Sequence, residues 1–227
     1  MNQKNHQYPP LCVEIRGPYA CFTRPELKSE RVSYPVMTPS AARGILEAIY
    51  WKPEFGYTVT AIEVLRPIRW ASIRRNEVTS MVTLDWVRKA MTDATMRFDV
   101  EDDRDQRNTV FLRDVAYRIH AQVRPRPHAG QPEAAYREQL RRRVDKGACY
   151  SQPFLGTREC SADFSQATGE SREEITEDLG LMLHSIGYSP AGETYSWFDA
   201  RLENGLLRIP EFGMELAAAP SQPGRGA

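Results

Sequence analysis

The chain has 227 residues, of which 41% are hydrophobic and 26% charged, and its 30 basic and 30 acidic residues give a formal net charge of zero. Such a composition is typical of a folded, soluble protein and does not mark a nucleic-acid binder by bulk charge. No apolar run is long enough to span a bilayer, which excludes membrane-spanning helices.

The first predicted element is a strand. Residues 1–10 are polar and end in two prolines, which predicts a loose tail. Residues 11–16 alternate apolar and polar side chains as a strand does, and residues 19–22 resume the apolar run after a bulge at Gly17. Residues 23–37 have the charges and prolines of a connecting loop.

A helix over 38–52, TPSAARGILEAIYWK, is the best-marked element of the chain. Thr38 can accept a backbone N–H as N-cap, and the proline after it suits the first helical position. Apolar residues at spacings of three, four and seven give the helix one apolar face. Because Pro53 disfavours helical geometry in the residue before it, the helix should end there, with Tyr50 and Lys52 in its last turn.

Strands are predicted for much of the following chain. Residues 57–75 are rich in β-branched residues around a central proline, which predicts an edge strand or two short strands. A short helix or strand and an acidic loop follow in 76–105. Residues 107–124 predict a hairpin that turns at residues 113–114, and the odd-numbered side chains of 115–123 should share one face.

A second helix is predicted over 132–146, ended by a glycine. The order of elements predicts an α+β fold, namely a ferredoxin-like βαββαβ domain over 11–148, the scaffold of RNA-recognition modules. Residues 149–213 predict a small β-rich C-terminal region with an Asn204-Gly205 turn between two of its strands. Residues 214–227 have the composition of a disordered tail.

Charge is distributed unevenly despite the zero net charge. Residues 113–146 hold nine Lys/Arg against four Asp/Glu, a balance of +5, whereas residues 160–203 hold two Arg against nine Asp/Glu, a balance of −7. A basic block beside an acidic one indicates a positive face on part of the molecule. Ion pairs between the two blocks are the alternative, and they would remove this signal.

The absence of several known motifs narrows the kinds of chemistry that the sequence can support. The sequence lacks the P-loop, dinucleotide-binding, nucleophile-elbow and H-E-x-x-H signatures, and its histidines and cysteines show no metal-ligand spacing. We therefore expect no metal and no cofactor, and the cysteines read as reduced thiols of a cytoplasmic protein. The remaining titratable groups suit metal-independent RNA cleavage, in which a base takes the 2′-hydroxyl proton and a cation stabilises the phosphorane. They suit plain binding equally well.

Four separated motifs carry a resemblance: GPYACFTRPE (17–26), SYPVMTPSAARGILEAIYWKP (33–53), LRDVAYRIHAQV (112–123) and KGACYSQPFLGTREC (146–160). In this order they resemble the fifth family of CRISPR-associated proteins, in its type I-C (Dvulg) form. The resemblance implies a RAMP-superfamily endoribonuclease that cuts precursor CRISPR RNA at the base of the repeat hairpin without metal. It also implies that the protein stays on the 5′ handle of the mature guide RNA, with other subunits of the type I-C surveillance complex.

The family's active site joins a Tyr in the IYWKP motif to a Lys-His pair near the start of the second helix. The tyrosine carries over to Tyr50, but the places of the pair hold Ala135 and Tyr136, or Ala134 and Ala135 after a shift of one. Tyr136 can replace the histidine as a hydrogen-bonding group, so Tyr50 and Tyr136 are the predicted catalytic residues. A phenol of ordinary pKa, about 10, is a poor base, so Tyr50 suits positioning or proton donation.

RNA contacts are expected from basic and polar residues of the two helices and of the strand between them: Arg43, Lys52, Arg118, His120, Arg124, Arg137, Arg141, Arg142 and Lys146. The missing Lys-His pair leaves a second interpretation open, a non-catalytic RNA- or DNA-binding subunit that caps the 5′ end of the guide RNA. Duplex DNA binding through the basic face is compatible with either interpretation and predicts a steep loss of affinity with salt.

Overall fold

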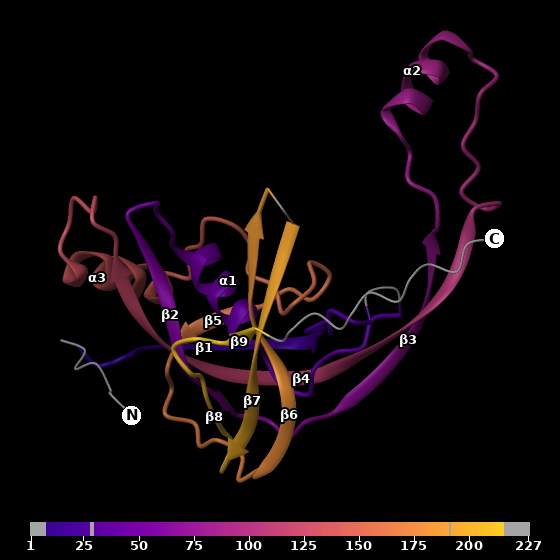
Figure 1. Ribbon diagram of the computed structural model, residues 1–227. Helices are drawn as coiled ribbons and strands as arrows, with labels where there is room; N and C mark the ends of the chain where they lie inside the picture. The colour runs from indigo at the N-terminus through magenta and orange to yellow at the C-terminus, as the bar shows by residue number, and fades with distance from the viewer. Residues whose placement is uncertain (1–7, 28–29, 191, 216–227) are drawn as a thin grey trace.

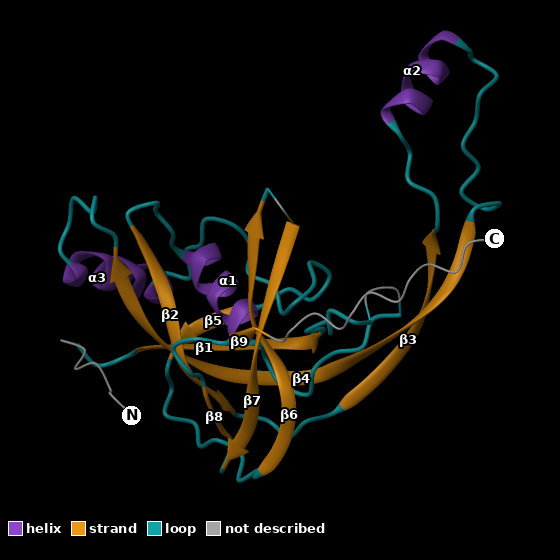
Figure 2. Ribbon diagram, in the orientation of Figure 1, coloured by secondary structure: helices purple, strands orange, loops and turns teal. Residues whose placement is uncertain are grey.

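The computed structural model describes residues 8–27, 30–190 and 192–215, so the ends of both predicted tails, 1–7 and 216–227, lie outside the described residues. Figures 1 and 2 show a mixed α/β fold dominated by antiparallel strands. The helices are α1 (Pro39–Ile49), α2 (Leu84–Thr92) and α3 (Glu133–Asp145). The strands are β1 (Leu11–Ala20), β2 (Phe55–Val64), β3 (Trp70–Val78), β4 (Arg104–Pro125), β5 (Asp163–Gln166), β6 (Glu177–Ser189), β7 (Gly192–Glu203), β8 (Leu206–Arg208) and β9 (Met214–Glu215).

One sheet connects the described strands. Its order is β5-β1-β4-β2-β8-β7-β6, with β3 paired to β4 and β9 paired to β7. β8 pairs with β2, so the strands of the C-terminal region extend the sheet of the N-terminal part. The helices α1 and α3 lie on one side of β1, β4 and β2 (Figure 1), and the core forms between these helices and the sheet.

The predicted start of α1 is confirmed, whereas its predicted end is not. The Thr38 hydroxyl accepts the Ala41 N–H at 3.2 Å, and the apolar face of the helix is buried. The helix ends at Ile49, however, and Tyr50 is its C-cap in an extended conformation (φ −152°, ψ 119°). The expectation that Tyr50 and Lys52 lie in the last turn was therefore wrong, because the proline limits how far a helix can run without requiring it to run that far.

The predicted hairpin at 107–124 was also wrong. β4 is one continuous strand of 22 residues. Asp114 does adopt a positive φ of 52°, as a turn residue would, but β1 remains paired on both sides of it. The predicted alternation of the second half of β4 is confirmed, because its odd-numbered residues from Val115 to Val123 are all buried.

The first half of β4 pairs with β3 instead of the central strands. Together with α2, these two strands form an arm that extends away from the body of the protein (Figure 1). The segment 76–105 thus holds a helix, and 57–75 belongs to two strands on either side of Pro67, one of the two predicted arrangements. No residue of α2 is buried.

The Asn204-Gly205 turn is confirmed. Both residues have positive φ, 49° and 73°, which is the conformation that favours Asn-Gly in a two-residue hairpin. The turn joins β7 to β8 and so brings the C-terminal strands back to β2.

Gly156 allows the closest backbone approach near α1. Its φ is +87°, and a Cβ at this position would lie 2.0 Å from the carbonyl oxygen of Cys21. We expect Gly156→Ala to lower the free energy of unfolding by at least about 2 kcal/mol, because both the backbone conformation and the overlap are unfavourable. Urea unfolding followed by circular dichroism would measure this.

Gly44 provides the matched control for Gly156. It lies within α1, and a Cβ there would meet no atom within 4 Å. Gly44→Ala should raise the free energy of unfolding by about 0.5–1 kcal/mol through helix propensity. Equal effects of the two alanines would contradict this account of Gly156.

Candidate functional site

Four aromatic side chains gather where α1 ends and β2 begins. Phe55 lies between Tyr50, at a ring-centroid distance of 5.3 Å, and Tyr136 of α3, at 4.8 Å. It also packs edge-on against Tyr57 at 5.2 Å. All four residues are buried, so the cluster fixes the end of α1 relative to β2 and α3 and brings the two predicted catalytic tyrosines together.

Tyr50 has a buried ring and an accessible hydroxyl. The residue as a whole is 7% exposed. Its hydroxyl makes no hydrogen bond within the described residues, and it is not among the fully buried polar atoms that lack a partner, so the oxygen keeps contact with solvent. Its backbone carbonyl accepts a hydrogen bond from the Tyr57 hydroxyl at 2.8 Å, which holds the extended cap in place.

Arg143 of α3 is the cation next to Tyr50. Its guanidinium carbon lies 5.3 Å from the Tyr50 ring centroid, and its Nη1 donates to the Ile49 carbonyl at 3.1 Å. Burial raises the pKa of Tyr50 above its ordinary value, an effect that Arg143 opposes and Glu54 supports. The phenol is therefore protonated at neutral pH and can donate a proton or hydrogen bond, but it is not a base.

Tyr136 is fully enclosed and already hydrogen-bonded. Its hydroxyl donates to Glu54 Oε2 at 2.6 Å and accepts the Gln131 N–H at 3.2 Å. Burial and the bond to Glu54 raise its pKa. It thus positions the Glu54 carboxylate and the loop before α3, and its catalytic role stays a prediction.

Tyr136→Phe tests this positioning. The substitution removes the donor to Glu54 and the acceptor for Gln131 without changing the ring, so we expect the free energy of unfolding to fall by about 1–3 kcal/mol. Urea unfolding would measure it, with Tyr19→Phe as control because the half-exposed Tyr19 ring lies on β1, outside the aromatic cluster. A loss no larger than that of the control would contradict the role of this hydroxyl.

Several predicted RNA-contact residues have exposed side chains. Arg43 lies on α1, Lys52 follows it, and Lys146 caps α3. On α3 both Arg141 and Arg142 have exposed side chains and pair with Glu138 of their own helix, at 3.9 Å and 3.3 Å. Such exposed pairs are weak and open readily, so these five residues remain predicted RNA contacts.

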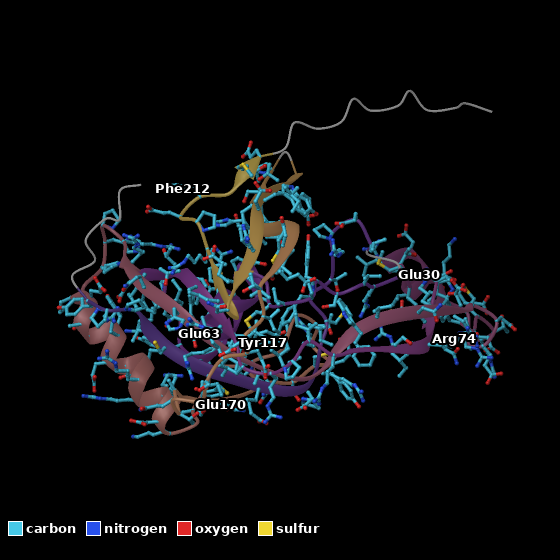
Figure 3. All side chains as sticks on the ribbon, turned by 90° about the horizontal axis from the view of Figure 1, so that it is seen from below. Glu30, Glu63, Arg74, Tyr117, Glu170 and Phe212 are labelled. Atoms are coloured by element: carbon cyan, nitrogen blue, oxygen red, sulfur yellow. The ribbon has the colours of Figure 1, made fainter. Side chains whose placement is uncertain are left out.

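Arg118 has a different environment. In the sheet it stands opposite Glu14 of β1 and Glu63 of β2, and its guanidinium donates to both, at 2.7 Å and 2.5 Å. A third bond reaches the Glu170 carbonyl oxygen at 2.7 Å. Glu63 and Glu170 lie over the central strands, far from Arg74 on the arm (Figure 3). Because its side chain is only 12% exposed, the Arg118 guanidinium serves to pair the carboxylates of neighbouring strands within the protein.

Three other predicted contacts also have internal partners. His120 Nε2 lies 3.0 Å from Glu63 Oε1, and Arg124 pairs with Glu211 at 3.4 Å. Arg137 is 2% exposed and donates to Gln122, Glu133 and the Pro9 carbonyl oxygen. We therefore no longer count Arg118, His120 and Arg137 among the residues expected to contact RNA. The expected positive strand face is offset mainly by Glu14 and Glu63, which lie outside the acidic block.

The sequence analysis missed Glu54 and Arg143. Arg143 stands seven positions after Tyr136, which on a helix is the same face, so its spacing could have indicated the contact. Glu54 carried no signal, because only the packing of α3 against β2 brings it to Tyr136.

No metal-binding group emerges in the part of the chain that the structure describes, where no three His, Cys, Asp or Glu residues lie together in an arrangement that could hold an ion. Within the same ranges no helix combines the length and the apolar composition needed to cross a membrane.

Comparison with known proteins gives the family. The family model of the CRISPR-associated Cas5 proteins, in its Cas5d form, matches residues 10–211. The chain belongs to the Cas5d family. It is 44% identical over 216 residues to the CRISPR pre-crRNA endoribonuclease Cas5d of Mannheimia succiniciproducens, covering 89% of this chain and 96% of that protein. It is 43% identical over 219 residues to the protein of the same name from Thermus thermophilus, covering 88% and 91%.

Solved structures share the Cas5d fold. A crystal structure of a CRISPR-associated protein superposes with a TM-score of 0.64 at 24% identity, covering 91% of this chain and 95% of the other. A chain of a CRISPR RNA-guided surveillance complex gives a TM-score of 0.50 at 14% identity, covering 88% and 91%. At these identities the likeness concerns the fold.

Proposed function

We propose that this Cas5d protein is an endoribonuclease that cuts precursor CRISPR RNA at the base of the repeat hairpin without a metal ion. It then remains on the 5′ handle of the guide RNA as a subunit of the type I-C surveillance complex. The observation that carries this proposal is the solvent-accessible Tyr50 hydroxyl beside Arg143, in a chain more than 40% identical to two proteins named as pre-crRNA endoribonucleases.

A ferredoxin-like domain is the proposed scaffold. The elements β1, α1, β2, β4, α3 and β5 follow the order βαββαβ, and the four strands lie side by side as β5-β1-β4-β2. This is the arrangement expected of that fold. The arm formed by β3, α2 and the first half of β4 is then an insertion between its second and third strands.

The proposed chemistry follows from the protonated phenol. Tyr50 donates a hydrogen bond or proton to an oxygen of the scissile phosphate, and the Arg143 guanidinium offsets the charge that develops there. The hydroxyl is held in position because the aromatic cluster and the Tyr57–Tyr50 hydrogen bond fix the cap of α1. Glu54, which accepts a hydrogen bond from Tyr136, is an acidic group near enough to help raise the pKa of Tyr50.

A non-catalytic subunit is the second candidate function. It is favoured by the buried Tyr50 ring and by the absence of a Lys-His pair at the start of α3, where Ala135 and Tyr136 stand. In that case the site around Tyr50 and Arg143 would bind the 5′ handle without cutting it. Duplex DNA would be a further partner of the exposed arginines, with an affinity that falls steeply as salt rises.

Incubation of the purified protein with its cognate repeat hairpin RNA in EDTA separates the two functions. Cleavage at one position supports the metal-independent enzyme. Tight binding with no product supports the non-catalytic subunit. If the RNA is neither bound nor cleaved, both functions are contradicted.

A further inference from the structure

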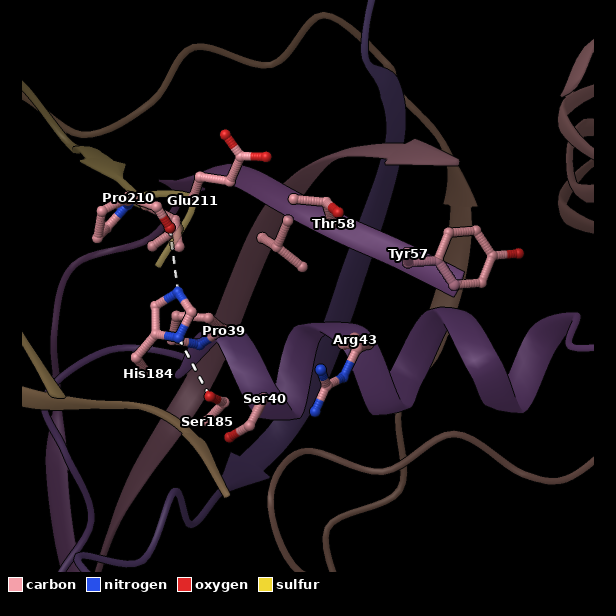
Figure 4. A pocket seen from close by; sticks show the side chains of 11 residues that line it. Pro39, Ser40, Arg43, Tyr57, Thr58, His184, Ser185, Pro210 and Glu211 are labelled. Atoms are coloured by element: carbon pink, nitrogen blue, oxygen red, sulfur yellow. Dashed lines mark hydrogen bonds between the residues drawn. The ribbon is translucent and has the colours of Figure 1, made fainter. Parts of the chain in front are cut away.

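A second polar site lies at the other end of α1 from Tyr50. Here the first turns of α1, the middle of β2, β6 and the segment after β8 enclose a cavity of about 120 Å³. Figure 4 shows the side chains of Ser40, Arg43, Thr58 and His184 around it. Small-molecule sites usually measure about 300–1,000 Å³, so this cavity suits one small polar group.

Arg43 is the uncommitted cation of the cavity. Its guanidinium donates no hydrogen bond within the described residues, and the Glu47 carboxylate stands 4.0 Å from Nε at the limit of an ion pair. The Thr58 hydroxyl also makes no hydrogen bond to any described residue. The acidic residue at the rim, Glu211, pairs with Arg124 at 3.4 Å. Because the pair with Glu47 is long and exposed, it is weak, and the fork of Arg43 donors is available to bind an anion.

Hydrogen bonds hold the side chains of the opposite wall in fixed positions. His184 Nε2 donates to the Pro210 carbonyl at 3.0 Å, and its Nδ1 lies 3.3 Å from the Ser185 hydroxyl (Figure 4). Ser185 in turn bonds to Ser196 of β7 at 2.7 Å. A Cβ on Gly213 would lie 2.9 Å from His184 Cβ, so the segment after β8 packs directly on this histidine, and Ile209, Pro210 and Glu211 of that segment line the cavity.

We propose that this cavity, lined by Arg43, Ser40, Thr58 and His184, binds one internal phosphodiester of the RNA strand whose cleavage is assigned to Tyr50. The proposal rests on the proposed function. Tyr57 joins the two sites, because it is one of the residues that line the cavity and its hydroxyl donates to the Tyr50 carbonyl. Arg43 and the C-cap Tyr50 are seven residues apart, which corresponds to about 10 Å along the axis of α1 at 1.5 Å per residue. A strand following α1 would therefore place one phosphate at Arg43 and another at Tyr50.

The first test is binding of the cognate repeat RNA as salt is varied. Arg43→Gln should weaken binding about tenfold and reduce the slope of log K against log salt by about 0.7, the contribution of one single-strand phosphate. Arg88→Gln is the matched control, because Arg88 is an exposed arginine of α2 on the arm, paired only with Asp85 among the described residues. Affinity and slope equal to those of this control would overturn the proposal.

The second test identifies the phosphate. Repeat RNAs each carry one neutral methylphosphonate linkage, next to a 2′-O-methyl nucleotide so that the linkage is stable. At one position in the series, the neutral linkage should weaken binding of the RNA to the unaltered protein about tenfold. The same linkage should leave binding to Arg43→Gln unchanged. Thr58→Val should reduce the effect of the same linkage. If no linkage shows this coupling, the cavity does not hold an RNA phosphate.

Free phosphate is distinguished by NMR of the His184 ring. If inorganic phosphate shifts this signal in the unaltered protein but not in Arg43→Gln, and no RNA linkage couples to Arg43, the cavity is a site for free phosphate and the RNA proposal is overturned. All these measurements concern binding. They can fail while the repeat is still cleaved in EDTA, or succeed without cleavage, so they do not depend on the outcome for the proposed function.

Discussion

Tyr50→Phe should slow single-turnover cleavage of the repeat hairpin RNA by at least about 100-fold. The substitution removes only the hydroxyl oxygen, which is proposed to donate to the scissile phosphate, and acid–base groups of this kind typically contribute 10²–10⁴-fold. The aromatic contact with Phe55 survives the change. Affinity for the RNA, measured by filter binding, should therefore change by no more than about threefold. This corresponds to about 0.6 kcal/mol, which is less than the roughly 1 kcal/mol that a typical hydrogen bond contributes.

Tyr19→Phe is the control for this experiment, since it makes the same chemical change on β1 away from the cluster. Cleavage by Tyr50→Phe at the rate of the control would show that the phenol takes no part in the reaction. The pKa of Tyr50 is raised by burial, so the phenol keeps its proton throughout the neutral range. The ratio of the two rates should accordingly be constant from pH 7 to about pH 9.

Arg118→Met should lower the free energy of unfolding by about 3–5 kcal/mol. Removal of the guanidinium leaves the fully buried Glu14 and the adjacent Glu63 without their shared cation, and breaking a buried ion pair on one side has a cost of this size. For a chain of this length each kcal/mol corresponds to about 2–4 °C in Tm, so calorimetry should record a decrease of roughly 6–20 °C.

Arg142→Met serves as the control for Arg118, because Arg142 is 65% exposed and, among the residues that the structure describes, pairs only with Glu138. Its effect should remain within about 0.5 kcal/mol. An equally small effect at Arg118 would mean that the buried network adds nothing to stability, and Arg118 would then return to the candidates for RNA contact.

Acid should weaken the same network. Burial alone would raise the pKa of Glu14, but hydrogen bonds from Arg118, Thr168 and Arg16 lower it below its ordinary value of 4.5. A carboxylate with a lowered folded-state pKa stabilises the protein above pH 4.5, and this contribution is lost as pH falls toward the folded-state pKa. Unfolding curves between pH 6 and 3 should show this loss in the unaltered protein and a smaller loss in Arg118→Met.

Local signals in the sequence were sufficient for several elements. The Thr38 cap and the apolar stripe predicted the start and buried face of α1, and Asn204-Gly205 predicted the turn from β7 to β8. Four motifs in order indicated the family, and the IYWKP motif among them predicted Tyr50 as a catalytic residue. Each of these signals lies within a few neighbouring residues, so it depends little on what the rest of the chain does.

Tertiary structure alone decided the register of the sheet. The alternation of β4 predicted that Arg118 and His120 share a face, but only the pairing with β1 and β2 placed Glu14 and Glu63 against them. The same holds for the turn signal at Asp114, which the continuous pairing of β1 overrides. β1, β2 and β4 are distant from one another in the sequence and are not joined by tight turns, so no local signal specified which of their residues stand opposite one another.

The sequence by itself therefore determined the family, α1 and α3 and the buried face of β4, and it predicted Tyr50 as a catalytic residue. Only the tertiary structure decided where α1 ends, that the Tyr50 ring packs against Phe55 while its hydroxyl stays accessible, and that Arg143 of α3 stands beside that ring. The physical reason is that capping and periodicity arise between neighbours in the chain, whereas burial and charge pairing arise between elements that meet only in the folded protein.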